Sequence, residues 1–180
     1  MQELSLNVMD VAQNSVTAGA SLITLRVFEN GNRLLIEILD NGKGMTSEQV
    51  AQVADPFYTT RTTRKVGLGV SLFKMQAEMT GGAFQITSKP GEGTDVTATF
   101  HTDHVDMIPI GDMESTVLLL ITCNPDTDFV YTRSRDDREF TLDTREMRQV
   151  LGEDIPLNMP DVTAWIKAYL QENLELIQGG

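Results

Sequence analysis

Residues 40–45 read DNGKGM and directly follow the stretch RLLIEILD at 33–40. The alternation of apolar and polar residues in 33–40 predicts a strand with one buried face. At Asp40 the pattern changes to a carboxylate, an amide and two glycines, which are poor material for a core. Because glycine permits close backbone approach and unusual torsions, the stretch predicts a carboxylate at a strand end, beside a turn that closely approaches another group.

The segments around this stretch predict helices interleaved with antiparallel strand pairs. The turn NGN between two alternating runs is typical of a hairpin, and PGEG predicts a second one. This order favours an α/β (α+β) two-layer sandwich with the sheet on one side. The expected elements are a helix at 3–17, strands at 22–29 and 33–40, a short helix at 46–55, a polar basic loop, a helix at 68–80, and strands at 83–89 and 94–102.

The charge is distributed unevenly along the 180 residues. Residues 1–100 carry 10 acidic and 8 basic side chains, whereas 101–180 carry 16 and 6. With 41% hydrophobic residues the chain can form a core, and its net charge of −12 argues against a nucleic-acid partner held through phosphates. The shift in charge predicts a boundary between residues 1–102 and an acidic region at 103–180.

Residues 103–180 predict a small α+β appendage, for which partner binding is a hypothesis. Residues 112–122 fit either a helix capped by Asp112 or a strand. Residues 128–142 predict a hairpin that turns at Asp136-Asp137. Two further helices are expected, at 143–151 with an Asp143/Glu146 capping box, and at 159–177 with an apolar face formed by Val162, Trp165, Ile166, Tyr169 and Leu170.

The single cysteine and the apolar runs limit the cellular context. Cys123 alone excludes an internal disulfide and a multi-cysteine zinc site, and its apolar neighbours predict a buried thiol. The start of the chain lacks the pattern of a signal peptide. The longest apolar run, VLLLI at 117–121, is far below the ~20 residues of a membrane span. We therefore expect no membrane span and a cytoplasmic location.

Three G-x-G units predict a phosphate ligand. A single unit is more typical of an ordinary turn. The middle unit, however, begins a helix and follows a basic loop, and a helix N-terminus offers free N–H groups to an anion. Neither a P-loop nor a complete dinucleotide fingerprint is present. The units are Gly42-Lys-Gly44, Gly67-Leu-Gly69 and Gly91-Glu-Gly93, and the basic residues of the loop are Arg61, Arg64 and Lys65.

Asp10 and Asn14 lie one helical turn apart on a polar stripe of the first helix, so both can reach one point. Hard oxygen ligands suit Mg²⁺, which usually shares its shell with substrate phosphates. A solvated helix face explains the two residues equally well when they are taken alone.

Taken in order, these segments resemble the histidine-kinase-like ATPases, the GHKL superfamily, whose nucleotide-binding architecture is called the Bergerat fold. DVAQNSVTAGA (10–20) resembles the N box and DNGKGM the first glycine box. DPFYTT resembles the F box, GLGVSLFK the second glycine box and GEGTDVTATF the last. The resemblance runs from about residue 4 to about residue 100 with no box missing.

The resemblance implies roles for individual residues. Asp40 would accept a hydrogen bond from the adenine amino group of ATP, Thr94 would support the base through water, and Asn14 would ligate Mg²⁺. Asp10 stands where several hydrolysing relatives carry a glutamate base, so it is the candidate catalytic residue. Residues 58–66 would form a lid over the phosphates. The other expected nucleotide contacts are Gly42, Gly44, Met45, Phe57, Thr60, Gly67, Leu68, Gly69 and Val70, together with Arg61, Arg64 and Lys65, which are chosen by their charge and position in the lid rather than by the resemblance.

Three functions follow as alternatives. Because the chain begins almost at the N box, we expect no helical hairpin with a phosphoacceptor histidine, and His101 and His104 have the surroundings of ordinary surface histidines. A stand-alone kinase would transfer the γ-phosphoryl group of Mg-ATP to histidine or serine on a partner protein. An ATP-operated binding module would instead change its affinity for a partner with little catalysis. An accessory subunit would hold the nucleotide structurally.

Overall fold

The structure is a computed structural model that describes residues 2–55 and 68–179. In chain order its elements are α1 (Leu4–Thr17), β1 (Leu22–Asn30), β2 (Arg33–Asp40), α2 (Ser47–Val53), α4 (Leu68–Met79), β3 (Ala83–Lys89), β4 (Gly93–His101), α5 (Met113–Cys123), β5 (Asp128–Arg135), β6 (Arg138–Asp143), α6 (Thr144–Leu151) and α7 (Pro160–Gln178).

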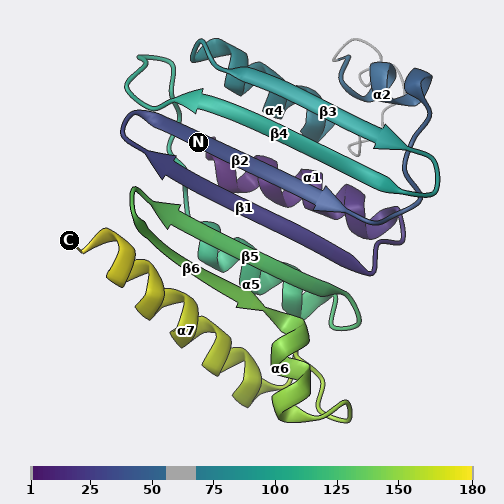
Figure 1. Cartoon of the computed structure of the whole chain (residues 1–180), viewed down its shortest axis with the longest axis vertical. Helices are drawn as coiled ribbons and strands as arrows, with labels where there is room; N and C mark the ends of the chain where they lie inside the picture. Colours follow the sequence, from purple (N-terminus) through teal and green to yellow (C-terminus); the bar gives the residue numbers. More distant parts are fainter. Residues whose placement is uncertain (1, 56–67, 180) are drawn as a thin grey trace.

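The strands described form one six-stranded sheet in the order β3-β4-β2-β1-β5-β6 (Figure 1). Neighbouring strands are antiparallel except β1 and β5, which run parallel. Helices α1, α4 and α5 cover one face of the sheet, while α7 runs along its β6 edge (Figure 1). In this arrangement β1 and β2 are central strands, and the turn after Asp40 lies at one end of the sheet.

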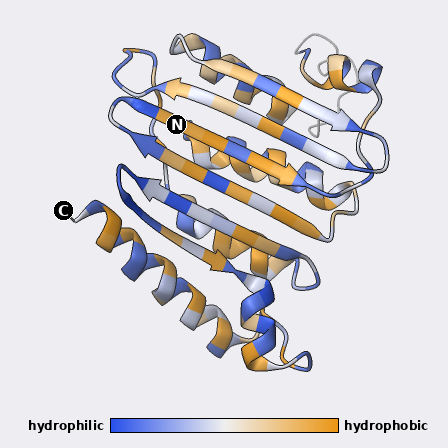
Figure 2. Ribbon diagram, in the orientation of Figure 1, coloured by the Kyte–Doolittle hydropathy of each residue, from blue (hydrophilic) through white to orange (hydrophobic). Residues whose placement is uncertain are grey.

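The core lies between the sheet and the layer of α1, α4 and α5. The predicted alternation of β1 and β2 is confirmed, because alternate side chains are buried over most of each strand, and much of their length is apolar (Figure 2). The buried residues are Ile23, Leu25 and Val27 in β1 and Leu34, Ile36 and Ile38 in β2. The predicted apolar stripe of α1 is buried as well. It consists of Leu4, Val8, Val11, Ala12 and Ser15.

Residues 103–180 extend the same sheet through the parallel pairing of β5 with β1, in which Leu22 lies opposite Asp128. The ambiguous segment 112–122 is a helix, and its cap is Asp112, whose Oδ1 accepts a hydrogen bond from the Ser115 N–H at 2.9 Å. Hydrogen bonds from Ser115 hold the pKa of Asp112 below its ordinary value. The boundary between a domain at 1–102 and a separate region at 103–180 stays a prediction.

Two predictions about the C-terminal region were wrong. Cys123 is exposed at the last residue of α5, whereas Leu120 and Ile121, one turn or less before it, are buried. Trp165 was expected on the core face of its helix, yet 54% of its surface is exposed. Its neighbour Ile166, which was predicted on the same face, is fully buried.

A buried ion pair joins α5 to β5. Arg133 donates from Nη1 to both carboxylate oxygens of Glu114 at 3.0 and 2.8 Å, and the Tyr131 hydroxyl donates to Glu114 Oε2 at 2.7 Å. Burial alone would lower the pKa of Arg133, but Tyr131 and the carboxylates of Glu114 and Glu29 raise it above its ordinary value. Burial, followed by the charge of Glu114, raises the pKa of Tyr131. The Arg133 guanidinium therefore remains charged inside the fold.

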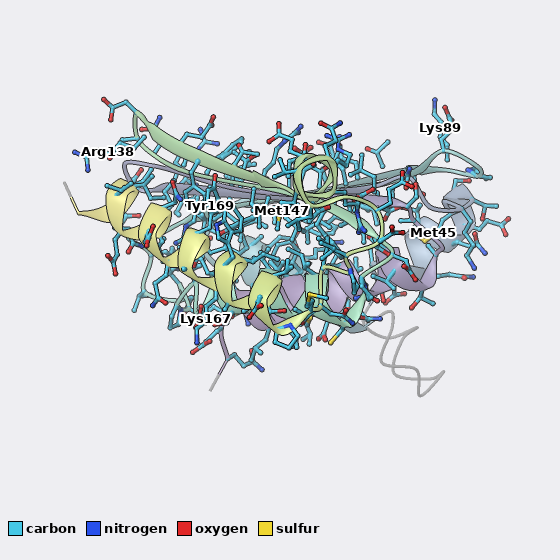
Figure 3. All side chains as sticks on the ribbon, turned by 90° about the horizontal axis from the view of Figure 1, so that it is seen from below. Met45, Lys89, Arg138, Met147, Lys167 and Tyr169 are labelled. Carbon is cyan, nitrogen blue, oxygen red and sulfur yellow. The ribbon has the colours of Figure 1, made fainter. Side chains whose placement is uncertain are left out.

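Figure 3 shows α1 and α7 on one side of the sheet, and the opposite face of the sheet points away from them. A polar row crosses this face, in which Arg26 Nη1 bonds Glu37 Oε1 at 2.7 Å. Asp95 lies beside this pair. Burial, then a hydrogen bond with Glu37 and repulsion from its charge, raises the pKa of Asp95 above its ordinary value. Among the described residues, no helix has both the length and the apolar character needed to cross a membrane.

Candidate functional site

Asp40, the last residue of β2, is held at both carboxylate oxygens. The Ser15 hydroxyl of α1 donates to Oδ2 at 2.6 Å, and the Gly42 N–H donates to Oδ1 at 2.8 Å. Hydrogen bonding makes a partly buried carboxylate tolerable. Since a carboxylate has about four acceptor positions, these two bonds fix the group and leave acceptor capacity for a ligand.

The turn after Asp40 is fastened to the start of β1. Asn41 Oδ1 accepts from the N–H groups of Ser21 and Leu22 at 2.9 and 3.0 Å, and Asn41 Nδ2 donates to Ser21 Oγ at 2.8 Å. At Gly42, an added Cβ would lie 2.9 Å from the Cβ of Ala18, so only glycine fits this close to the end of α1. The strand end is thus a rigid mount for the carboxylate.

The same turn is tied to the β3–β4 hairpin. The Met45 N–H donates to Ser88 Oγ at 2.8 Å, and Ser88 also bonds the Gly93 carbonyl at 3.0 Å and the Thr94 hydroxyl at 2.8 Å. Gly44 has φ of 69°, and a Cβ there would lie 1.9 Å from a backbone oxygen of β3, so the turn requires glycine. In the β2–β4 register, Thr94 lies directly opposite Asp40.

Helix α4 begins beside the polar stripe of α1. A Cβ on Gly69 would lie 2.6 Å from the Cβ of Asp10, so the first turn of α4 packs tightly on α1 at this glycine. Asp10 itself is exposed, whereas Asn14 is half-buried. The free N–H groups expected at the start of α4 are therefore close to the helix that carries both residues.

These elements enclose a cleft of ≈170 Å³. Its walls combine apolar side chains with the carboxylate of Asp40 and the amide of Asn14. The lining residues are Val11, Asn14, Ser15, Thr17, Ala18, Ile38, Asp40, Lys43, Gly44, Met45, Val53, Val70, Thr94 and Val96.

The cleft brings together six of the expected site residues, and places others beside it. Asp10 and Gly69 lie next to the cleft rather than in its lining, and Gly42 is bonded to Asp40. The six are Asn14, Asp40, Gly44, Met45, Val70 and Thr94. Outside the described residues lie Phe57, Thr60, Arg61, Arg64, Lys65 and Gly67, and the side chain of Leu68 is not described either.

Residues 1–104 match the family described as histidine kinase-, DNA gyrase B- and HSP90-like ATPases. The chain belongs to this ATPase family. The membership supports ATP binding, and it covers the segment in which every lining residue of the cleft lies. The family match, the mixed six-stranded sheet and the solved structures described below confirm the expected histidine-kinase-like α/β fold.

Bacterial kinases are among the proteins with a similar sequence. The chain is 34% identical over 106 residues to the sensor histidine kinase YxdK and 29% identical over 103 residues to sporulation kinase B, both of Bacillus subtilis (strain 168). The matches cover 55% and 57% of this chain but 33% and 24% of those proteins. The chain thus spans a third or less of these relatives' length.

Two solved structures share the fold at low identity. The N-terminal domain of a DNA repair protein matches 79% of this chain and 53% of its own, with a TM-score of 0.56 and 15% identity. The Aquifex aeolicus MutL ATPase domain complexed with ADP matches 84% and 69%, with a TM-score of 0.50 and 16% identity.

A metal ion at this site would have to share its ligands between the protein and a bound molecule. Among residues 2–55 and 68–179, no three His, Cys, Asp or Glu side chains are grouped so that they could hold a metal. Mg²⁺ usually takes one or two protein oxygens and completes its shell with waters and substrate phosphates. The half-buried amide of Asn14 in the cleft fits that requirement.

Several residues of the site had no role in the sequence prediction. Ser15 was assigned to the apolar stripe of α1, although a hydroxyl buried there needs a partner and finds one in Asp40. Asn41 and Ser88 hold the turn in place, and Lys43 lines the cleft. The hydrogen-bonding requirement of a buried hydroxyl was the one available signal, and it applied to Ser15.

Proposed function

We propose that this chain binds Mg-ATP in the cleft and transfers the γ-phosphoryl group to histidine or serine on a separate protein. The observation that carries the proposal is the fixed carboxylate of Asp40 in the lining of an otherwise largely apolar cleft. A nucleobase with an exocyclic amino group, such as adenine, offers a donor that this acceptor can bind.

The cleft fits the base end of the nucleotide. Its ≈170 Å³ is below the ~300–1,000 Å³ of pockets that enclose a drug-sized ligand, so the described part of the site holds one end of ATP. Ile38 and Val96 supply apolar surface for the purine ring, and Asp40 accepts from its amino group. Thr94, beside Ser88, supports the same edge.

The phosphates would extend toward α1 and the start of α4. Asn14 would contribute one ligand to Mg²⁺, which when bound would neutralise charge on the phosphate oxygens. Asp10 lies beside Gly69, where it could accept the proton of an attacking serine hydroxyl. The acceptor oxygen or nitrogen then forms the bond to phosphorus as the bond to the β-phosphate oxygen breaks and ADP leaves. Arg61, Arg64 and Lys65 remain predicted phosphate contacts.

Transfer of label from γ-labelled ATP tests the kinase proposal. The chain is incubated with Mg²⁺, labelled ATP and each purified protein encoded by a neighbouring gene. Label on one such protein, lost with Asn14→Ala, is the expected result. Binding of ATP without label on any of these proteins would argue against phosphotransfer.

An ATP-operated binding module is the second candidate. The observation in its favour is Asp10, which is exposed, does not line the cleft, and is one methylene shorter than the glutamate base that the family resemblance implies. In that case a non-hydrolysable ATP analogue would change the affinity for a partner as much as ATP does. Different effects of ATP and the analogue would favour the kinase. The protein partner and the cytoplasmic location stay predictions.

A further inference from the structure

A second hollow, here named the C-terminal groove, lies between α6, α7 and β6, at the opposite edge of the sheet from β3. Its volume is ≈530 Å³, larger than that of the cleft. The groove is lined by Thr141, Leu142, Asp143, Glu146, Met147, Val150, Leu151, Asp161, Val162, Trp165 and Tyr169.

The groove presents apolar surface to solvent on a fixed support. Trp165 is 54% exposed and Val150 87% exposed, above a floor that includes the buried Leu142 and Met147. The rings of Trp165 and Tyr169 stack with centroids 5.2 Å apart. The Tyr169 hydroxyl donates to the Thr141 carbonyl at 2.8 Å, which holds the stack against β6. Exposed, rigid aromatic surface of this kind marks an interaction site.

The charges that line the groove are all acidic. Asp143 is neutralised locally by Arg145, at 2.9 Å, so it adds little to the field. Glu146 and Asp161 are exposed, and neither forms an ion pair within the described part of the chain. Figure 3 shows Lys167 on the side of α7 away from Tyr169 and Met147, so this cation does not offset them.

We propose that the C-terminal groove docks a cationic amphipathic segment of a partner protein. Apolar side chains of the segment would cover Trp165 and Val150, and its lysines or arginines would lie against Glu146 and Asp161. An apolar strip flanked by charge of one sign is complementary to an amphipathic helix with the opposite charge. The groove shares no lining residue with the nucleotide cleft, so docking does not depend on the proposed ATP chemistry.

Trp165 is the only tryptophan, so its fluorescence reports binding at the groove directly. The probe is a synthetic amphipathic helical peptide of leucine and lysine, of about 18 residues, and the control peptide carries glutamate in place of lysine. We expect a saturable blue shift with the lysine peptide alone. The shift should weaken as salt is added, because exposed charges are screened.

Charge reversal locates the binding. The Glu146→Lys, Asp161→Lys double variant should weaken binding by about tenfold or more. The matched control is Glu172→Lys, Glu175→Lys, which changes the net charge equally at exposed positions of α7 outside the groove. This control should change the affinity by less than about threefold, because exposed charges distant from the ligand contribute little.

Three results would overturn the proposal. These are the absence of a spectral shift with the lysine peptide, an equal shift with the glutamate peptide, and equal weakening by the two double variants. Concentration-dependent dimers that Val150→Asp abolishes, measured by sedimentation equilibrium, would instead assign the groove to a second copy of the chain. At an exposed position such as Val150 this substitution leaves the core intact.

Discussion

Replacing Asp40 by asparagine tests the adenine contact with almost no change in shape. The Gly42 N–H can only donate, so the amide oxygen must take the place of Oδ1, 2.8 Å from Gly42 N. The amide nitrogen then faces Ser15 Oγ, which now donates at 2.6 Å but can accept once its hydroxyl rotates. Both internal bonds survive, and we expect the variant to fold.

We expect Asp40→Asn to weaken nucleotide binding more than it destabilises the fold. The amide nitrogen of Asp40→Asn presents a donor to the donating amino group of adenine. Removal of a hydrogen bond to a charged acceptor is worth about 1.5–3 kcal/mol, which corresponds to about 10- to 150-fold in Kd. Inosine triphosphate carries an accepting oxygen at the same ring position, so its affinity should fall less, or rise.

Calorimetric titration of wild type and Asp40→Asn with non-hydrolysable adenosine and inosine analogues, in Mg²⁺, measures this exchange. Ser15→Ala is the matched control. It removes a donor to the carboxylate and keeps the acceptor, so ATP affinity should fall by less than about tenfold. Unchanged affinity of Asp40→Asn for the adenosine analogue, or equal loss for both analogues at an unchanged Tm, would refute the adenine assignment.

Three further predictions concern the metal and the stability of the fold. Asn14→Ala should abolish the Mg²⁺ dependence of ATP binding in titrations with and without metal, and an undiminished dependence would contradict the metal role. Glu114→Ala should lower the free energy of unfolding in urea by about 3–5 kcal/mol, because it leaves the buried Arg133 with only its longer contact to Glu29, at 3.3 Å; a loss below about 1 kcal/mol would contradict this. Asp95 has a raised pKa, so the folded state binds more protons than the unfolded state between pH 3.8 and the raised pKa, and wild-type stability falls as the pH rises through this window. Asp95→Asn should therefore be more stable than wild type at pH 7. The difference between their free energies of unfolding, measured in urea titrations, should shrink toward pH 3.8. A difference that stays constant over this pH range would contradict the raised pKa of Asp95.

Local patterns predicted most elements of the fold. Alternation identified β1 and β2, and a capping residue at Asp112 was one of two interpretations of a segment that proved to be helical. The continuous apolar run 117–121 could not decide between helix and strand, because both bury such a run. The parallel pairing of β5 with β1 leaves no local mark in either strand, so the sequence could not indicate that both halves share a sheet.

The candidate site was predictable where a residue type has one use. The carboxylate at a strand end, Asp40, was predicted from the local pattern, and its cross-strand neighbour Thr94 was predicted only from the family resemblance; both line the cleft. Ser15 was missed because small residues on a buried stripe usually serve packing. Asn41 was missed because asparagine is common in turns, and its three bonds to Ser21 and Leu22 depend on a contact between segments 20 residues apart.

The parallel pairing of β1 with β5 also sets an order in time. On the ribosome, β1 and β2 can form their hairpin early, whereas β5 emerges on the order of a hundred residues later, and such non-local closures are slow. Until then the outer edge of β1, from Leu22 to Glu29, has no strand beside it. Unpaired edges of this kind invite strands from other chains. The nascent protein is therefore prone to strand pairing with other chains until β5 has paired with β1.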